Sequence, residues 1–220
     1  MTFQRARTEE QREARRQAIL EAAAAMLEEM PVADVSLNEL SRRVGLAKSN
    51  VLRYFDSREG VLLELLTSAT REWVGELSRA LPALDPAAPL PSRAEQVADV
   101  VARTLSARRV LCDLVGAQGS VLEHNVTVDV VRHHKHVAHR LLAEVGELLR
   151  GVLPELGASA DVVGFQVAVF AAALAPYSSP SAAVLAAYAA DPGLAALHQE
   201  LPDSLRQAVR TVLLGALPRT

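Results

Sequence analysis

The chain has 220 residues, of which half are hydrophobic and 4% aromatic, and its formal net charge is −3. This length suggests one or two domains with a large apolar core, and the near-neutral charge gives no global sign of a nucleic-acid partner. The single cysteine, Cys112, excludes an internal disulfide and favours a reducing compartment.

No targeting or membrane segment is expected. The N-terminus is too charged for a secretory signal, and the apolar run 162–176 is too short and too rich in alanine to span a bilayer. We therefore expect a soluble, cytoplasmic protein without a membrane partner.

The first predicted helix covers residues 8–30. Thr8 and Gln11 fit a capping box, apolar residues then recur at helical spacing, and Pro31 ends the pattern. Ser36 opens a second capping box, which begins another helix with one apolar face.

Gly45 then permits the unusual backbone of a tight turn, and a short helix is expected through 47–54. Asp56 opens a third capping box at the start of a long helix that runs to about residue 80. This helix has one apolar stripe, formed by Leu62, Leu66, Ala69, Trp73 and Leu77.

Residues 81–91 contain four prolines and are expected to form a connector, which is a possible domain boundary. Short helices are expected within 181–200. Longer helical patterns follow the connector at 92–110, 111–122, 126–152, 158–175 and 203–216. Because no strand pattern is present, the predicted fold class is all-α.

Basic residues gather near the N-terminus. Five Arg or Lys and two acids lie between Ser36 and Arg58, and the first 16 residues add five Arg against three Glu. On a helical wheel of residues 47–55, one face is apolar and the other polar. The inward face holds Ala47, Val51 and Phe55, and the outward face holds Ser49, Asn50 and Arg53.

This outward face suits the recognition of bases in DNA. Arg53 could pair with guanine and Asn50 with adenine, since these side chains match the hydrogen-bonding edges of those bases. Phosphate contacts are expected from Lys48, Tyr54, Arg42 and Arg58. The pattern alone also fits an ordinary solvated helix face, so both interpretations stay open at this point.

Residues 9–66, about a quarter of the chain, resemble the N-terminal domain of the tetracycline-repressor-type (TetR/AcrR) transcription regulators. The match is carried by VSLNELSRRVGLAKSNVLRYFDSREGVLLELL, in which the caps, the turn length and the Tyr54-Phe55 pair agree with the family pattern. The resemblance implies a three-helix helix-turn-helix DNA-binding domain over 1–56. It also implies a C-terminal helical domain over 57–220 that binds a ligand and dimerises.

By position, the resemblance implies DNA contacts from Asn38, Arg42, Lys48, Ser49, Asn50, Arg53, Tyr54 and Arg58. Three positions depart from the family pattern. Leu52 stands where the family often has a phosphate-binding Tyr, Ala47 leaves the recognition helix without a side-chain N-cap, and Arg58 replaces a common Lys.

Two stripes predict a dimer interface of four helices. The first consists of small residues, Gly164, Ala168, Ala171 and Ala175, which allow helices to approach closely. The second lies on the last helix and consists of Leu205, Ala208, Val209, Val212 and Ala216. The alternative is that both stripes pack inside one subunit.

Five of the six histidines lie in 124–139, which raises the possibility of a metal site. Their spacing does not match the His-x-x-x-His pairing common on helices, so a solvated polar face is favoured over a metal or pH sensor. No metal ligand and no cofactor are predicted. Cys112 is interpreted as a small buried hydrophobic residue rather than a redox switch.

His134 differs from its neighbours because it lies on the apolar stripe of its helix. A buried polar group needs a partner, so His134 is either a satisfied core residue or a residue that binds an effector. The other polar or aromatic residues expected to face the interior, and so to line a mostly apolar ligand pocket, are Trp73, Gln118, Asn125, Phe165 and Gln166.

The sequence therefore predicts a homodimeric transcription regulator, most simply a repressor that a small, largely hydrophobic effector releases from a palindromic operator. In this prediction the long helix after residue 57 transmits the effector signal. The alternatives are a metal- or pH-responsive regulator, an activator, or a helical interaction module without DNA binding. An enzyme is not expected, because no catalytic or phosphate-binding motif is present.

Overall fold

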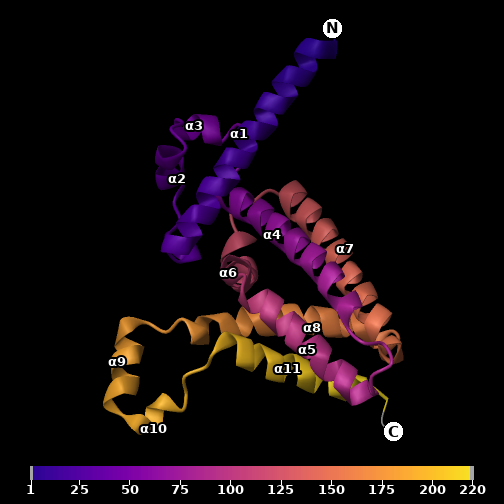
Figure 1. Cartoon of the computed structure of the whole chain (residues 1–220). Coiled ribbons are helices and arrows are strands. Elements are labelled where there is room, and N and C mark those ends of the chain that lie inside the picture. Colours follow the sequence, from indigo (N-terminus) through magenta and orange to yellow (C-terminus); the bar gives the residue numbers. More distant parts are fainter. Residues whose placement is uncertain (1, 219–220) are drawn as a thin grey trace. The chain divides into compact units, whose positions relative to one another are not determined.

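The structure of the chain, a computed structural model, describes residues 2–218 and the side chains of residues 9–218. This part is helical and contains no strand, which confirms the all-α prediction (Figure 1). The helices are α1 (Thr2–Glu29), α2 (Leu37–Arg43), α3 (Lys48–Val51), α4 (Arg58–Ala80), α5 (Leu90–Ser106), α6 (Arg109–Ala117), α7 (Val128–Val152), α8 (Ser159–Leu174), α9 (Ala182–Ala190), α10 (Pro192–Ala195) and α11 (Leu201–Ala216).

The chain packs into two compact units. The first comprises the residues up to Ser68 together with Ala117–Lys135, and the second comprises Ala69–Gly116 and the chain from His136 onward. Helices α4 and α7 therefore each contribute to both units. These units are defined by packing, whereas the predicted segments 1–56 and 57–220 are functional divisions and stay a prediction.

Only one of the three predicted capping boxes caps its helix as expected. Ser36 accepts a hydrogen bond from the Glu39 N–H at 3.1 Å and begins α2. The prediction at Asp56 is wrong by one residue, because α4 begins at Arg58 and Ser57 accepts from the Gly60 N–H. The prediction at Thr8 is also wrong, because α1 is already helical from Thr2.

In the second unit, α11 packs against both α5 and α8. The small-residue stripe predicted as a contact between subunits is core here, since Ala171 is only 1% exposed. A Cβ atom on Gly164 would lie 3.3 Å from Val145, which explains why glycine stands where α8 crosses α7. On α11, Leu205 and Val209 are likewise buried, so both stripes pack inside one subunit.

The outward face of α8 is apolar instead. Val162, Phe165 and Val169 recur at helical spacing and are between 46% and 57% exposed. The stretch Ser159–Ser178 is long and apolar enough to cross a membrane by length and composition, which is weak evidence when it stands alone. The buried stripe on the opposite side of α8 is what the core helix of a globular unit would show.

A buried hydrogen bond gives a first testable prediction. The Trp73 indole N–H donates to the Thr104 hydroxyl at 3.1 Å, and Thr104 is 1% exposed. Thr104→Val keeps the side-chain volume but leaves the indole N–H without an acceptor, so the free energy of unfolding should fall by about 1–3 kcal/mol in urea titrations. Thr104→Ser, which keeps the hydroxyl, is the control, and a fully stable Thr104→Val variant would contradict the assigned role.

Candidate nucleic-acid interface and effector residues

Helices α2 and α3 form a helix-turn-helix. Gly45 in the turn has φ +65°, a left-handed conformation that glycine adopts without strain. Ala47 precedes α3 without a side-chain cap, as the sequence indicates. Helix α3 is shorter than the predicted 47–54, because the N–H groups of Arg53 and Tyr54 bond to carbonyls three residues back and the chain continues in turns to Phe55.

The two faces of α3 are divided largely as predicted. Val51 and Phe55 are 0% and 5% exposed and belong to the core of the first unit. Ala47 was expected on the same face, but it is exposed because it lies before the first turn of the helix. The outward residues are all exposed, namely Lys48, Ser49, Asn50 and Arg53.

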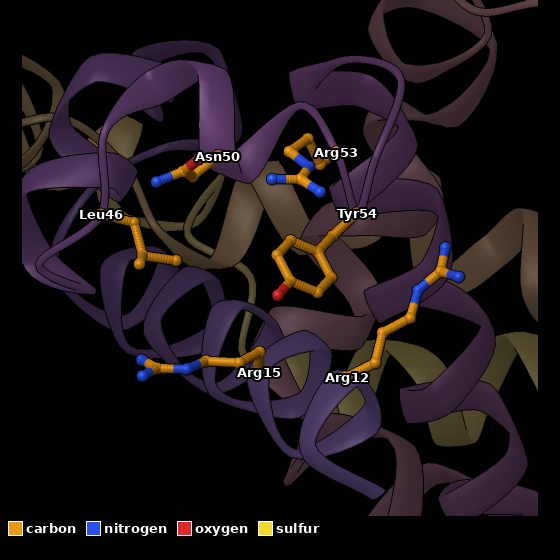
Figure 2. Close-up of a pocket in the computed structure, with 6 residues that line it drawn as sticks. All are labelled: Arg12, Arg15, Leu46, Asn50, Arg53 and Tyr54. Atoms are coloured by element: carbon orange, nitrogen blue, oxygen red, sulfur yellow. The ribbon is translucent and has the colours of Figure 1, made fainter. Parts of the chain in front are cut away.

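A groove of about 520 Å³ runs between α1 and the end of α3 (Figure 2). Asn50, Arg53 and Tyr54 reach into it from one side, while Arg12 and Arg15 of α1 lie on the other. The groove thus combines three cationic side chains with an amide and a phenol hydroxyl. These are the groups that hydrogen-bond to phosphates and base edges.

The three groove arginines have no ion-pair partner among the described residues, whereas a fourth arginine nearby is fully engaged. Arg16 binds the Glu64 carboxylate, donates to the Tyr54 carbonyl at 2.7 Å, and lies 4.3 Å over the Phe55 ring. Arg16 therefore joins α1 to the segment after α3 and to α4. Arg12, Arg15 and Arg53, which have no ion-pair partner among the described residues, line the groove.

Arg42 remains exposed on α2, beside Asn38, which is also exposed. Its guanidinium pairs with Glu39 at 2.6 Å. Hydrogen bonds from Arg42 and Arg43 lower the pKa of Glu39 to about 2, so this carboxylate stays charged at neutral pH. A phosphate would have to compete with Glu39 for Arg42.

Arg58 lies at the start of α4, as the sequence indicates, but its side chain has partners within the protein. Its guanidinium donates to the backbone carbonyls of Val32 and Ala33 and lies near the Glu59 carboxylate. Its side chain is only 21% exposed. Arg58 thus fastens the start of α4 to the short 3₁₀ helix before α2, and its contact with phosphate stays a prediction.

Sequence reasoning missed Arg12 and Arg15 as members of the groove. The cluster of arginines in the first 16 residues is visible in the sequence. No pattern there indicates which of them face α3, because this depends on how α1 crosses the helix-turn-helix. Helical spacing shows which arginines share a face of α1. It does not show that Arg16 faces inward while Arg12 and Arg15 face the groove, because this depends on the crossing.

Half of the residues predicted to face the interior and line a ligand pocket are exposed instead. Asn125, Phe165 and Gln166 are exposed, so the expectation that they face the interior is wrong for this single chain. Gln118 is half-buried and donates to the Glu123 carboxylate at 2.6 Å. Trp73 is buried, and its only polar group is already bound by Thr104.

His134 is buried, as predicted, and only one of its ring nitrogens has a partner. Its Nδ1 lies 3.2 Å from the Thr67 hydroxyl, and that hydroxyl donates its own proton to the Leu63 carbonyl. Nδ1 therefore carries the proton and donates to Thr67, which leaves Nε2 as an acceptor. No described group donates to the buried Nε2.

The other histidines of 124–139 and the cysteine have no such geometry. His124, His133, His136 and His139 are exposed, and in the described part of the chain no three potential metal ligands come together. Cys112 is fully buried, and desolvation raises the pKa of its thiol to about 12. This burial confirms the interpretation of Cys112 as a small core residue.

Two family models match the chain. Residues 19–65 match the family described as bacterial regulatory proteins, tetR family, and residues 67–220 match the tetracyclin repressor-like C-terminal domain. The search of curated proteins found no match.

Several solved structures share the fold. The fatty acid degradation regulator FadR from Bacillus halodurans is 14% identical, with a TM-score of 0.54 over 94% of this chain and 97% of that chain. The TetR-family regulator PfmR from Thermus thermophilus is 19% identical, with a TM-score of 0.53 over 91% and 99%. A TetR-family regulator from Bordetella parapertussis is 19% identical, with a TM-score of 0.52 over 90% and 93%. At these identities the likeness shows the fold.

The buried His134 gives a prediction about pH. Desolvation, followed by the charge of Lys135, lowers the pKa of His134 below its usual value of 6.5. As the pH falls below about 6.5, His134 therefore becomes protonated in the unfolded chain before it does so in the folded chain. The free energy of unfolding then decreases. Between pH 7.5 and 5.5, the free energy of unfolding should fall more for the wild type than for His134→Gln, as measured by urea titration. Equal losses in both proteins would show that His134 does not titrate in this way.

Proposed function

Since this chain belongs to the tetR family of bacterial regulatory proteins, we propose that it is a homodimeric repressor released from a palindromic operator by a small molecule. Members of this family bind DNA operators and small-molecule effectors and act as dimers. The observation that carries DNA binding here is the groove, whose three arginines have no ion-pair partner among the described residues.

The groove residues take distinct roles in this proposal. Arg53 and Asn50 project from α3 and contact base edges in the major groove, because their side chains can make paired hydrogen bonds to guanine and adenine. Arg12 and Arg15, together with the Tyr54 hydroxyl, contact phosphates beside it. Further phosphate contacts come from the exposed residues around them, namely Asn38, Arg42, Lys48 and Ser49. Arg58 is left out because it is bound to backbone carbonyls.

The dimer in this proposal forms through the outward faces of α8 and α11. Val162, Phe165 and Val169 on α8 and Leu214 on α11 are exposed apolar residues on helices that pack against each other. Two such pairs of helices would bury these side chains together. A symmetric dimer presents two recognition helices, so its operator is a palindrome with half-sites about one helical turn apart.

The effector in this proposal is a largely apolar molecule that carries a hydrogen-bond donor. The unpartnered Nε2 of His134 is an acceptor inside an apolar stripe that includes Val137 and Leu141. Pairing it with a ligand hydroxyl or N–H removes the cost of leaving a buried polar atom unsatisfied. The effector releases DNA to the extent that it favours a conformation with low operator affinity. Because bacterial DNA lies in the cytoplasm, the proposed compartment is the cytoplasm.

Selection of bound duplexes from a random DNA pool tests the proposal. The wild type should enrich a palindrome, with binding that weakens as salt rises. On that operator, Arg53→Ala should lose about 1–3 kcal/mol of binding free energy and relax the preference at one base position. Arg15→Ala should weaken all sequences alike and reduce the salt dependence by about one phosphate contact.

Arg79→Ala is the matched control, because Arg79 is an exposed arginine outside the helix-turn-helix. Its operator affinity should equal that of the wild type. If Arg53→Ala kept both the affinity and the base preference, the assignment of α3 as the recognition helix would be wrong. The absence of any enriched sequence, after refolding to remove bound ligand, would contradict DNA binding.

The effector proposal is tested with His134→Phe, which keeps an aromatic ring but removes the acceptor. This variant should bind the operator within about twofold of the wild type, because His134 lies outside the groove. In a screen of apolar alcohols, phenols and amides for operator release, compounds active on the wild type should lose at least tenfold in potency on the variant, about 1.4 kcal/mol. A variant that folds, as judged by circular dichroism, and responds normally would leave His134 a core residue.

A further inference from the structure

The segment of the chain between α8 and α11 is apolar and exposed to solvent. We call residues 179–200, which contain α9 and α10, the arm. In α9 every residue from Ala182 to Ala190 is Ala, Val, Leu or Tyr. Within the second unit, Figure 1 shows α9 and α10 standing away from α8 and α11.

The arm has a defined internal structure. Ser181 caps the start of α9 by accepting from the Val184 N–H, and Asp191 caps α10 by accepting from the Gly193 N–H at 2.8 Å. The Tyr188 ring meets the His198 ring edge-on, with centroids 6.1 Å apart. The arm is therefore a helical hairpin with capped helices rather than an irregular loop.

This hairpin exposes its apolar side chains. Neither α9 nor α10 contains a buried residue, and Leu185, Leu194 and Leu197 are 49%, 39% and 60% exposed. A helix that is apolar on all sides is normally buried, and helices shorter than about 12 residues are marginal without packing. The arm therefore needs a permanent partner surface in the folded protein.

The charges of this region exclude two kinds of partner. No Lys or Arg lies between Arg150 and Arg206, so the arm has no cation for nucleic acid or for an anionic membrane surface. The arm contains two acids: Asp191, whose carboxylate caps α10, and Glu200, whose carboxylate lies 3.0 Å from the His198 ring. Because most of its exposed side chains are apolar, the arm fits an apolar protein surface best.

We propose that the arm packs across a second copy of this chain, so that two subunits exchange arms. The arm is continuous in the chain with α8 and α11, whose outward faces carry exposed apolar residues such as Phe165 and Leu214. A second copy seated on those faces lies within reach of the arm, and two-fold symmetry makes the exchange reciprocal. This inference rests on the proposed homodimer, and it adds that the arm of each subunit packs on the surface of the other.

Photo-crosslinking in full-length protein tests the exchange. A photoreactive phenylalanine analogue at position 185 is introduced, and ¹⁵N-labelled and unlabelled chains are mixed to form mixed dimers. After irradiation, crosslinked peptides from position 185 should pair labelled with unlabelled sequence, as detected by mass spectrometry. Crosslinks only within chains of one label would mean that the arm folds onto its own subunit, and would overturn the inference. Crosslinks to lipid or to other proteins in place of a second copy would overturn it as well.

A substitution pair measures the contribution of the arm to the dimer. Leu185→Asp should raise the dimer dissociation constant at least tenfold in analytical ultracentrifugation. Val128→Asp is the matched control, because Val128 is an apolar residue of another helix that is 80% exposed, and it should change the constant less than twofold. An unchanged constant in Leu185→Asp, with the dimer intact, overturns the arm exchange alone. A wild type that stays monomeric at every concentration instead overturns the proposed homodimer.

Discussion

The arrangement of the helix-turn-helix depends on one side chain, Arg16. Its guanidinium binds the Glu64 carboxylate of α4 and the Tyr54 carbonyl after α3, and it covers the Phe55 ring. A planar guanidinium can pair with a carboxylate, donate to a carbonyl and stack on a ring at the same time, a combination that the compact ammonium of a lysine does not match. Because α1 is held in this way, the two preceding arginines, Arg12 and Arg15, face α3 and complete the groove.

The arginines of the first unit divide by partner rather than by sequence position. Arg16, Arg43 and Arg58 are bound to carboxylates or backbone carbonyls, and they fasten helices to one another. Arg12, Arg15 and Arg53 have no ion-pair partner among the described residues and line one groove. A set of unpaired cations on a rigid support is what a polyanion recognises, since phosphate contacts need charge that the protein does not itself neutralise.

In the second unit, α8 has one face buried in the core and one apolar face exposed to solvent. One side of α8 is buried, with Gly164 allowing a close approach to α7. The other side is apolar and exposed, and the arm continues this exposed apolar surface. In the proposed dimer, a second copy covers both the exposed apolar face of α8 and the arm. Both surfaces are exposed to solvent in a single chain.

The sequence by itself determined the helical class, the helix-turn-helix with its Gly45 turn, the outward position of Asn50 and Arg53, and the burial of His134 and Cys112. These follow from periodicity, caps and turn chemistry, which are local properties of the chain. Tertiary structure alone decided that Arg58 binds backbone carbonyls, that Arg12 and Arg15 face α3, and that the Gly164 stripe is core while Phe165 is exposed. The physical reason is that periodicity shows which residues share a face of a helix. Which partner that face meets depends on how helices distant in sequence cross.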